Sequence, residues 1–359
     1  MAKTRVVVVD DSALVRSLLS AIINRQRDME CVGSAADPLL AREMIRTLDP
    51  DVITLDVEMP HMDGIDFLAK LMRLRPTPVV MVSTLTERGA DVTLRALELG
   101  AIDFVAKPKI GVADGLRQLA GDITDKIRVA AQATLRRPAA ATIAAANGTH
   151  RVVGPIAALG HGATGSVVFI GASTGGTEAT REVLAHLPAD CPPVMITQHM
   201  PAGFTKSYAA RLDGLCRIRV LEARDGERIL PGHAYIAPGG VAHLSIERSG
   251  SFCIARVQVA EAVNRHRPSI DVLFRSAARV VGPKAIGVML TGMGADGASA
   301  MKEMRDAGSY NLVQDEASCV VFGMPRAAIA AGAAHEVLPV TRIAGRLVER
   351  LRSAAGTAH

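Results

Sequence analysis

The first part of the chain alternates short apolar runs with amphipathic segments. Residues 6–9 are four consecutive valines, a pattern typical of a strand buried on both faces of a parallel sheet. Leu14, Leu18 and Ile22 follow at helical spacing. The same alternation predicts strands at 30–34, 52–55, 79–82 and 103–105 and helices at 38–48, 64–73, 88–99 and 115–129. Five β/α units in series predict a doubly wound parallel sheet.

A second α/β pattern begins at residue 166. It predicts strands at 167–170, 194–198, 234–237, 243–246, 253–259, 286–290, 310–313 and 336–338, and helices at 177–187, 203–212, 269–281, 296–307, 325–331 and 343–352. The strand-rich segment 217–259 favours a hairpin or antiparallel edge. Between the two patterns, small residues with Gly and Pro indicate a linker. We therefore predict domains at 1–125 and 163–356, joined by a linker at 126–162.

Composition narrows the class of protein. A length of 359 residues favours two domains, and 49% hydrophobic with 21% charged residues is typical of a globular chain. The net charge is +5, but no Lys/Arg run indicates a nucleic-acid arm. Five scattered cysteines without a C-x-x-C pattern indicate neither a disulfide framework nor a zinc site. With no secretory signal and no apolar run of membrane-spanning length, we expect a cytoplasmic protein that does not insert into membranes.

Polar residues follow several predicted strands of the first domain. Asp10 and Asp11 come after the first strand, Asp56 after the third, Ser83 after the fourth and Lys107 after the fifth. Taken singly, each carboxylate could cap a helix or a turn. Because ligands bind at the carboxyl ends of such strands, the set instead predicts a phosphoryl-accepting carboxylate beside Mg²⁺, with a hydroxyl and a lysine opposite.

These residues give the first domain a specific resemblance. Residues 5–125 resemble a two-component response-regulator receiver domain, through Asp10, Asp11, the segment 55–64 around Asp56, Ser83 and the Lys-Pro pair at 107–108. The resemblance implies a flavodoxin-like fold and phosphorylation of Asp56 by a chemotaxis histidine kinase. It also implies that Asp11, Asp56 and the backbone carbonyl of Glu58 bind Mg²⁺ with assistance from Asp10. Ser83 and Lys107 would act in the switch, with an aromatic near the fifth strand, where Phe104 lies.

The second domain carries a candidate nucleophile. Residues 171–175 read GASTG, which fits the G-x-S-x-G turn that exposes a serine, here Ser173, between a strand and a helix. A Gly-rich turn of this kind also binds phosphates. His199 follows the next predicted strand, and Asp296 follows a later strand and a second Gly-rich turn. Nucleophile, base and base-orienting carboxylate on one edge of a sheet predict a serine hydrolase.

Other interpretations remain open at this point. The two Gly-rich turns could hold a nucleotide, or the second domain could be a nucleic-acid-binding output domain. We expect no nucleic-acid partner, because the sequence shows neither a helix-turn-helix pattern nor a clustered basic stripe. For the remaining histidines of the domain we predict surface or satisfied core positions; they are His186, His233, His243, His266 and His335.

Residues 160–355 resemble the catalytic domain of the chemotaxis protein-glutamate methylesterase (CheB) family. The matching segments are 171–176, 198–200, 237–240, 267–274 and 290–297. The resemblance implies a Rossmann-like α/β domain that hydrolyses glutamate methyl esters and deamidates glutamines on methyl-accepting chemoreceptors, without a cofactor for the hydrolysis. The backbone N–H of Met293 would stabilise the oxyanion, and Thr174 would support the network. Phosphorylation of the receiver would shift the protein toward its active form.

Overall fold

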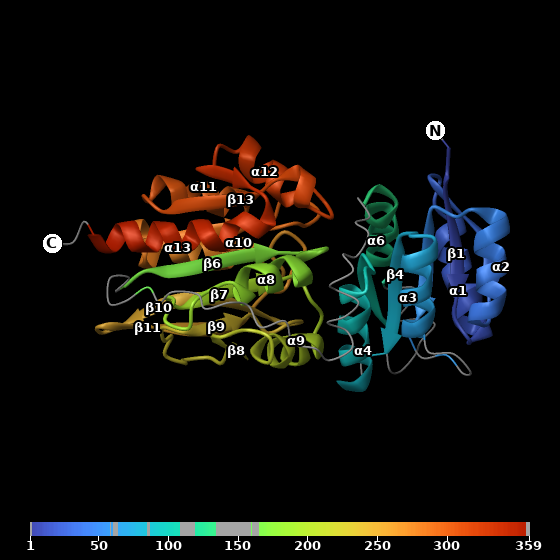
Figure 1. Cartoon of the computed structure of the whole chain (residues 1–359), viewed down its shortest axis with the longest axis horizontal. Coiled ribbons are helices and arrows are strands. Elements are labelled where there is room, and N and C mark those ends of the chain that lie inside the picture. Colours follow the sequence, from blue (N-terminus) through green and yellow to red (C-terminus); the bar gives the residue numbers. More distant parts are fainter. Residues whose placement is uncertain are drawn as a thin grey trace. The chain divides into compact units, whose positions relative to one another are not determined.

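The chain folds into two compact units, residues 1–151 and 152–359 (Figure 1). The structure is a computed structural model that describes residues 2–57, 59, 64–84, 87–107, 119–133, 159 and 165–356. The predicted linker lies mostly outside the described residues. None of the helices in the described ranges combines the length and the apolar character that a membrane span requires.

The first unit is a five-stranded, fully parallel sheet with strand order β2-β1-β3-β4-β5. This is the flavodoxin-like order, and it confirms the predicted doubly wound sheet. The strands are β1 (Thr4–Val9), β2 (Met29–Ala35), β3 (Val52–Asp56), β4 (Val79–Thr84) and β5 (Asp103–Lys107). The helices are α1 (Ala13–Asn24), α2 (Pro38–Leu48), α3 (Gly64–Leu74), α4 (Glu87–Glu98) and α6 (Ala120–Gln132). The predicted domain boundary at residue 125 therefore falls within α6.

The second unit has a seven-stranded parallel sheet with strand order β14-β13-β12-β6-β7-β9-β8. Its strands are β6 (Val167–Ala172), β7 (Val194–Gln198), β8 (Arg219–Glu222), β9 (His233–Ile236), β12 (Ala285–Met289), β13 (Tyr310–Gln314) and β14 (Glu336–Leu338). Strands β10 (Ala242–Ser249) and β11 (Phe252–Val259) form a separate antiparallel hairpin, as predicted. Strand β8 was not predicted, because this short edge strand is only partly buried and has no continuous apolar run.

Six α-helices complete the described part of the second unit: α8 (Gly176–Ala185), α9 (Phe204–Asp213), α10 (Ile270–Val280), α11 (Ala298–Asp306), α12 (Met324–Ala330) and α13 (Val340–Gly356). Two short 3₁₀ segments, Gly282–Lys284 and Glu316–Ser318, lie in connections. From β6 the chain runs to β7 in one direction along the sheet, and from β12 to β13 in the other. The sheet therefore has a topological switch point between β6 and β12, which is where ligands of such sheets bind.

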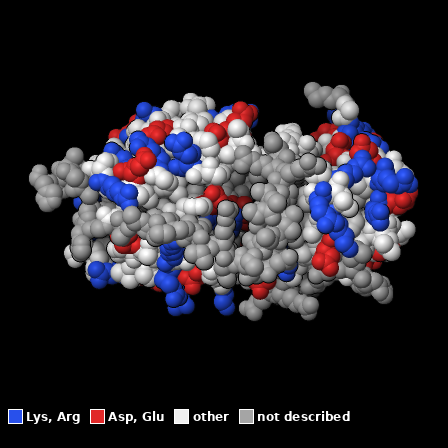
Figure 2. All heavy atoms as spheres, viewed as in Figure 1, with Lys and Arg blue, Asp and Glu red and all other residues white. Residues whose placement is uncertain are grey.

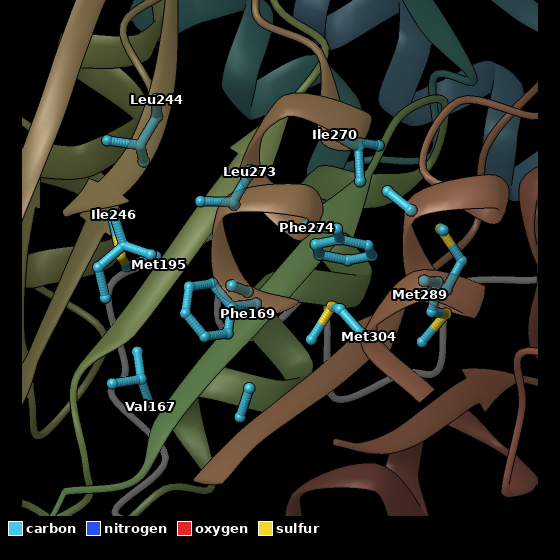
Figure 3. Close-up of a cluster of buried hydrophobic side chains, with 14 of the residues drawn as sticks. Val167, Phe169, Met195, Leu244, Ile246, Ile270, Leu273, Phe274, Met289 and Met304 are labelled. Carbon is cyan, nitrogen blue, oxygen red and sulfur yellow. The ribbon is translucent and has the colours of Figure 1, made fainter. Parts of the chain in front are cut away.

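Helix α10 connects the hairpin to the sheet. Its Leu273 and Phe274 are fully buried in one hydrophobic cluster with Phe169 of β6 and Leu244 of β10 (Figure 3). Burying an aromatic side chain of this size contributes about 1.5–3 kcal/mol. This packing fixes the amino end of α10 beside the switch point.

The surface carries mixed charge. In the view of Figure 2, basic and acidic side chains lie interspersed on both units. This mixture agrees with a net charge of +5 that comes from a sequence without a Lys/Arg run.

Candidate functional site

The turn after β6 presents Ser173 at the carboxyl end of the sheet. Gly175 takes a left-handed conformation with φ 75°, and a Cβ there would lie 2.6 Å from Cβ of Val320. Only glycine meets both conditions. The backbone N–H of Ser173 donates to the carbonyl of Thr291 at 3.0 Å, which ties this turn to the loop after β12. The two Gly-rich turns predicted from the sequence thus meet at the switch point.

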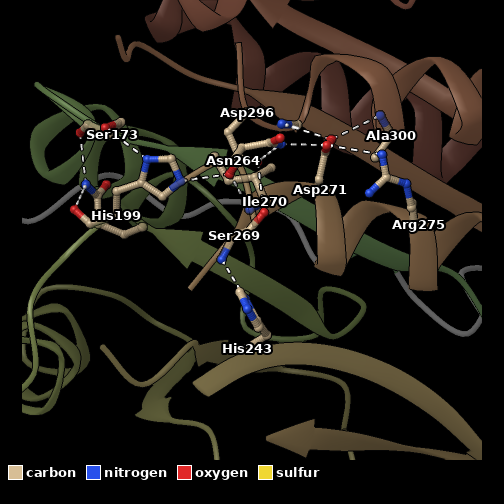
Figure 4. A network of polar contacts seen from close by, with 12 residues as sticks. Ser173, His199, His243, Asn264, Ser269, Ile270, Asp271, Arg275, Asp296 and Ala300 are labelled. Atoms are coloured by element: carbon tan, nitrogen blue, oxygen red, sulfur yellow. Dashed lines mark hydrogen bonds and ion pairs between the residues drawn. The ribbon is translucent and has the colours of Figure 1, made fainter. Parts of the chain in front are cut away.

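His199 follows β7 and faces the serine. Its Nδ1 lies 3.2 Å from Oγ of Ser173, and its Nε2 lies 2.9 Å from Oδ2 of Asp296 (Figure 4). Nε2 therefore donates to the carboxylate, which leaves the lone pair of Nδ1 to accept the serine proton. The structure brings together the three residues that the sequence placed on one edge of the sheet.

Asp296 is a buried carboxylate, 3% exposed, with four hydrogen-bond donors. Oδ2 accepts from His199 and from the N–H of Ile270 at 2.7 Å. Oδ1 accepts from Nδ2 of Asn264 at 2.7 Å and from Oγ of Ser269 at 2.8 Å. Burial alone would raise the pKa of Asp296, but the donors and the adjacent imidazole outweigh it and lower this pKa below its ordinary value. The carboxylate is thus ionised at neutral pH.

Several residues of this network were not predicted. Gln198 donates from Nε2 to the carbonyls of Ser173, at 2.9 Å, and His199, at 3.2 Å. The ring of His266 stacks on that of His199, with centroids 3.8 Å apart. His266 was expected to have a surface or core position without a role at the site, and nothing in its local sequence indicates the stacking. His243 does have a satisfied core position, because both of its ring nitrogens have partners.

Met293 and Thr174 lie in the two turns beside Ser173. Met293 is 41% exposed, and within the described residues its N–H has no hydrogen-bond acceptor. Thr174 is buried, and its carbonyl accepts from Oγ1 of Thr291 at 3.0 Å. An N–H group without an acceptor, like that of Met293, can bind a developing oxyanion when it lies next to a nucleophile.

The first unit holds a separate acidic cluster. Ligand atoms of Asp10, Asp11 and Asp56 lie within 4.8 Å of one another. Nζ of Lys107 lies 2.7 Å from a carboxylate oxygen of Asp10 and 2.7 Å from one of Asp56. Burial would lower the pKa of Lys107, but these two carboxylates outweigh it and raise the pKa. The four residues therefore meet as the sequence indicates, and a set of carboxylate oxygens fits Mg²⁺.

The other expected receiver residues have mixed outcomes. Ser83 is buried within β4, one strand away from Asp56, and its Oγ donates to the carbonyl of Gly89 at 3.3 Å. Phe104 is buried in β5, with Nζ of Lys126 5.2 Å from its ring centroid. Glu58, whose carbonyl the resemblance assigns to the metal, lies outside the described residues.

Two protein families match the chain. The CheB methylesterase family matches residues 168–347, and the response regulator receiver domain matches residues 6–113. The former contains Ser173, His199 and Asp296, and the latter contains Asp10, Asp56 and Lys107. Neither family description supports the alternative of a nucleic-acid-binding output domain.

Similar proteins match over nearly their whole length. A protein-glutamate methylesterase/protein-glutamine glutaminase of Albidiferax ferrireducens is 66% identical and covers 99% of this chain and 95% of its own. One of Bordetella parapertussis is 60% identical, with 98% of both chains covered. Among solved structures, the CheB methylesterase catalytic domain of Thermotoga maritima is 39% identical with a TM-score of 0.51. It covers 52% of this chain and 99% of its own.

Proposed function

The chain belongs to the family of CheB methylesterases with a response-regulator receiver domain, and from this premise we propose that it hydrolyses glutamate methyl esters on methyl-accepting chemoreceptors. The same site would deamidate receptor glutamines, because an amide carbonyl is attacked in the same way and ammonia leaves. The observation that carries the proposal is the hydrogen-bonded series from Ser173 through His199 to Asp296 at the switch point.

The proposed reaction begins with proton transfer to His199. Nδ1 of His199 takes the proton of Ser173 as Oγ attacks the ester carbonyl. Asp296 holds the imidazole with its proton on Nε2 and stabilises the imidazolium that forms. His199 then returns a proton to the departing methanol, and water hydrolyses the acyl-enzyme to free glutamate.

The negatively charged oxygen of the tetrahedral intermediate needs a hydrogen-bond donor to stabilise it. We assign this role to the backbone N–H of Met293, since it lies in the loop tied to the serine turn. Removing one such donor typically costs 10²–10³-fold in kcat, or about 2.7–4 kcal/mol. Thr174 supports the arrangement through its carbonyl, which receives the hydroxyl of Thr291. All groups in this reaction belong to the protein, the substrate or water.

Control of the hydrolase is assigned to the receiver unit. We propose that a chemotaxis histidine kinase phosphorylates Asp56 and that this activates hydrolysis. Asp10, Asp11 and Asp56 would hold Mg²⁺ together with the carbonyl of Glu58. The cation, when bound, neutralises charge on the transferred phosphoryl oxygens. Lys107 contributes a second positive charge at the same carboxylates, and Ser83 supplies the hydroxyl of the switch.

Methanol release from methylated receptors tests the hydrolytic proposal. We expect Ser173→Ala to abolish release, because no other group in the network can replace the Oγ nucleophile. Ser166→Ala is the matched control, since Ser166 lies at the opposite end of β6, and we expect it to retain release. Methanol release by Ser173→Ala at the wild-type rate would overturn the proposal.

A further inference from the structure

The predicted catalytic triad consists of Ser173, His199 and Asp296. A tight turn outside this triad contacts the carboxylate of Asp296. Residues 263–266 form a two-residue turn, closed by a hydrogen bond from the N–H of His266 to the carbonyl of Val263 at 2.9 Å. Both central residues, Asn264 with φ 51° and Arg265 with φ 69°, are left-handed, although neither is glycine. Non-glycine residues adopt this conformation when surrounding contacts enforce it, and such residues gather at functional sites.

The side chain of Asn264 supplies such a contact. A single nitrogen, Nδ2, donates to Oδ1 of Asp296 at 2.7 Å and to Oδ2 of Asp271 at 2.8 Å (Figure 4). Asp296 is 3% exposed and Asp271 is 4% exposed. The amide thus uses both of its protons to bridge two buried carboxylates, each of which would raise the proton affinity of the other.

Asp271 connects the bridge to two helices. Its Oδ1 accepts from the N–H groups of Gly297, at 3.1 Å, and Ala300, at 3.2 Å, at the start of α11. Its Oδ2 receives Nη2 of Arg275 at 3.2 Å. Among the described residues, His199 after β7 and Arg275 on α10 pair with the two carboxylates. The partners of the carboxylates in turn contact Glu303 on α11, His266 and His243.

We propose that Asn264 is a positioning residue of the hydrolase, whose amide separates Asp271 from Asp296 electrostatically and holds Asp296 against His199. The inference rests on the proposed function, because it assigns Asn264 a role in orienting the proposed base. Within the described residues, the side chain of Asn264 hydrogen-bonds to Asp271 and Asp296 and not to Ser173. Substitution of Asn264 should therefore change the proton affinity of the His199–Asp296 pair and kcat, and it should leave KM unchanged.

The test is the pH profile of kcat/KM for methanol release by the full-length protein. Asn264→Gly removes the amide and relieves the left-handed backbone, so the turn keeps its conformation. Without the amide, each carboxylate loses one hydrogen-bond donor, so that more of their negative charge acts on His199. We expect the acid limb to move to higher pH by about one unit, with lower kcat and unchanged KM. Asn264→Asp, which keeps the shape and replaces the donor by an acceptor, should move the limb in the same direction and further.

A second substitution distinguishes charge from structure. Asp271→Asn in the Asn264→Gly background removes one of the two facing charges, and we expect the acid limb to return toward its wild-type position. If Asn264→Gly lowers activity equally at all pH values, or the limb stays displaced after Asp271→Asn, the inference is wrong. If Ser173→Ala is inactive while both Asn264 variants keep the wild-type profile, only this inference fails and the proposed function stands.

Discussion

The imidazole of His199 faces its two partners in a defined way. Nδ1 points to Ser173 and Nε2 points to Asp296. The tautomer that can accept the serine proton is therefore the one that carries its own proton on Nε2. Asp296 enforces this tautomer, because its carboxylate is ionised and accepts from Nε2. An N–H donor presented to Nε2 would favour the opposite tautomer, whose Nδ1–H would donate to Oγ of Ser173 and could not accept the serine proton.

Asp296→Asn tests this role at the scale of one residue. The amide can donate to Nε2 and so stabilise the tautomer that cannot accept the serine proton, and we expect kcat to fall by about 10³–10⁴-fold. Methanol release from methylated receptors gives the rate. Asp306→Asn, an exposed carboxylate at the far end of α11, is the control and should keep wild-type kcat. Equal rates for the two variants would contradict the role of Asp296.

The sequence was sufficient to predict the three residues of the candidate triad. It was not sufficient to predict the residues that hydrogen-bond to them or stack on them. Ser173, His199 and Asp296 each follow a strand, so the edge they share can be predicted from strand order alone. Asn264 contacts Asp296, and Asp271 is linked to Asp296 through Asn264, only because a turn, α10 and the loop before α11 meet in space. No spacing rule along the chain predicts such a contact. The same holds for the stacking of His266 on His199.

At the scale of elements, the loops after β6 and β12 pack against each other at Ser173. A Cβ on Gly292 would lie 2.7 Å from Cβ of Ser173 and 2.5 Å from Sδ of Met324. The carbonyl of Gly292 also accepts from the N–H groups of Gly323 and Met324, at 3.1 and 2.9 Å. The loop that carries Met293 is therefore packed between the serine turn and the start of α12.

Gly292→Ala should displace the serine turn or the loop that carries Met293. We expect kcat to fall by about 10²-fold, because a misplacement of about 1 Å is enough for such a loss. Gly345→Ala is the matched control, since a Cβ at Gly345 meets nothing within 4 Å in the exposed face of α13. That control should keep full activity and gain about 0.5–1 kcal/mol in unfolding free energy, measured by urea denaturation. Wild-type kcat in Gly292→Ala would contradict the close packing.

Element types were predictable where the apolar pattern was continuous. The buried strands β1, β3, β6, β7 and β12 were predicted from such patterns, and the hairpin β10–β11 from the strand-rich segment 217–259. Strand β8 was not predicted because its four residues show no apolar pattern of their own. It is recognised as a strand only by its parallel pairing with β9. The sequence predicts Asp56, Ser83 and Lys107 just after their strands. The structure has Ser83 inside β4 and the other two as the last residues of β3 and β5, because polar residues at a strand end do not show where the ladder stops.

At the scale of the whole molecule, two sites lie at the carboxyl ends of two parallel sheets. In the first unit, Asp10 and Asp11 follow β1 and Asp56 is the last residue of β3. In the second unit, Ser173, His199 and Asp296 follow β6, β7 and β12. The repeated strand–helix pattern made both sheets predictable. The exact ends of the two domains stay a prediction, because composition shifts over many residues between them. We propose that the two sites are linked functionally, and this link is open to a direct measurement.

Methanol release with and without a small phosphodonor, in the presence of Mg²⁺, measures that link. We expect the donor to accelerate release by the wild-type protein, and Asp56→Asn to keep basal release without acceleration, because the phosphoryl acceptor is gone. Asp51→Asn, at the opposite end of β3, is the control and should respond as the wild type does. A normal acceleration in Asp56→Asn would contradict the account.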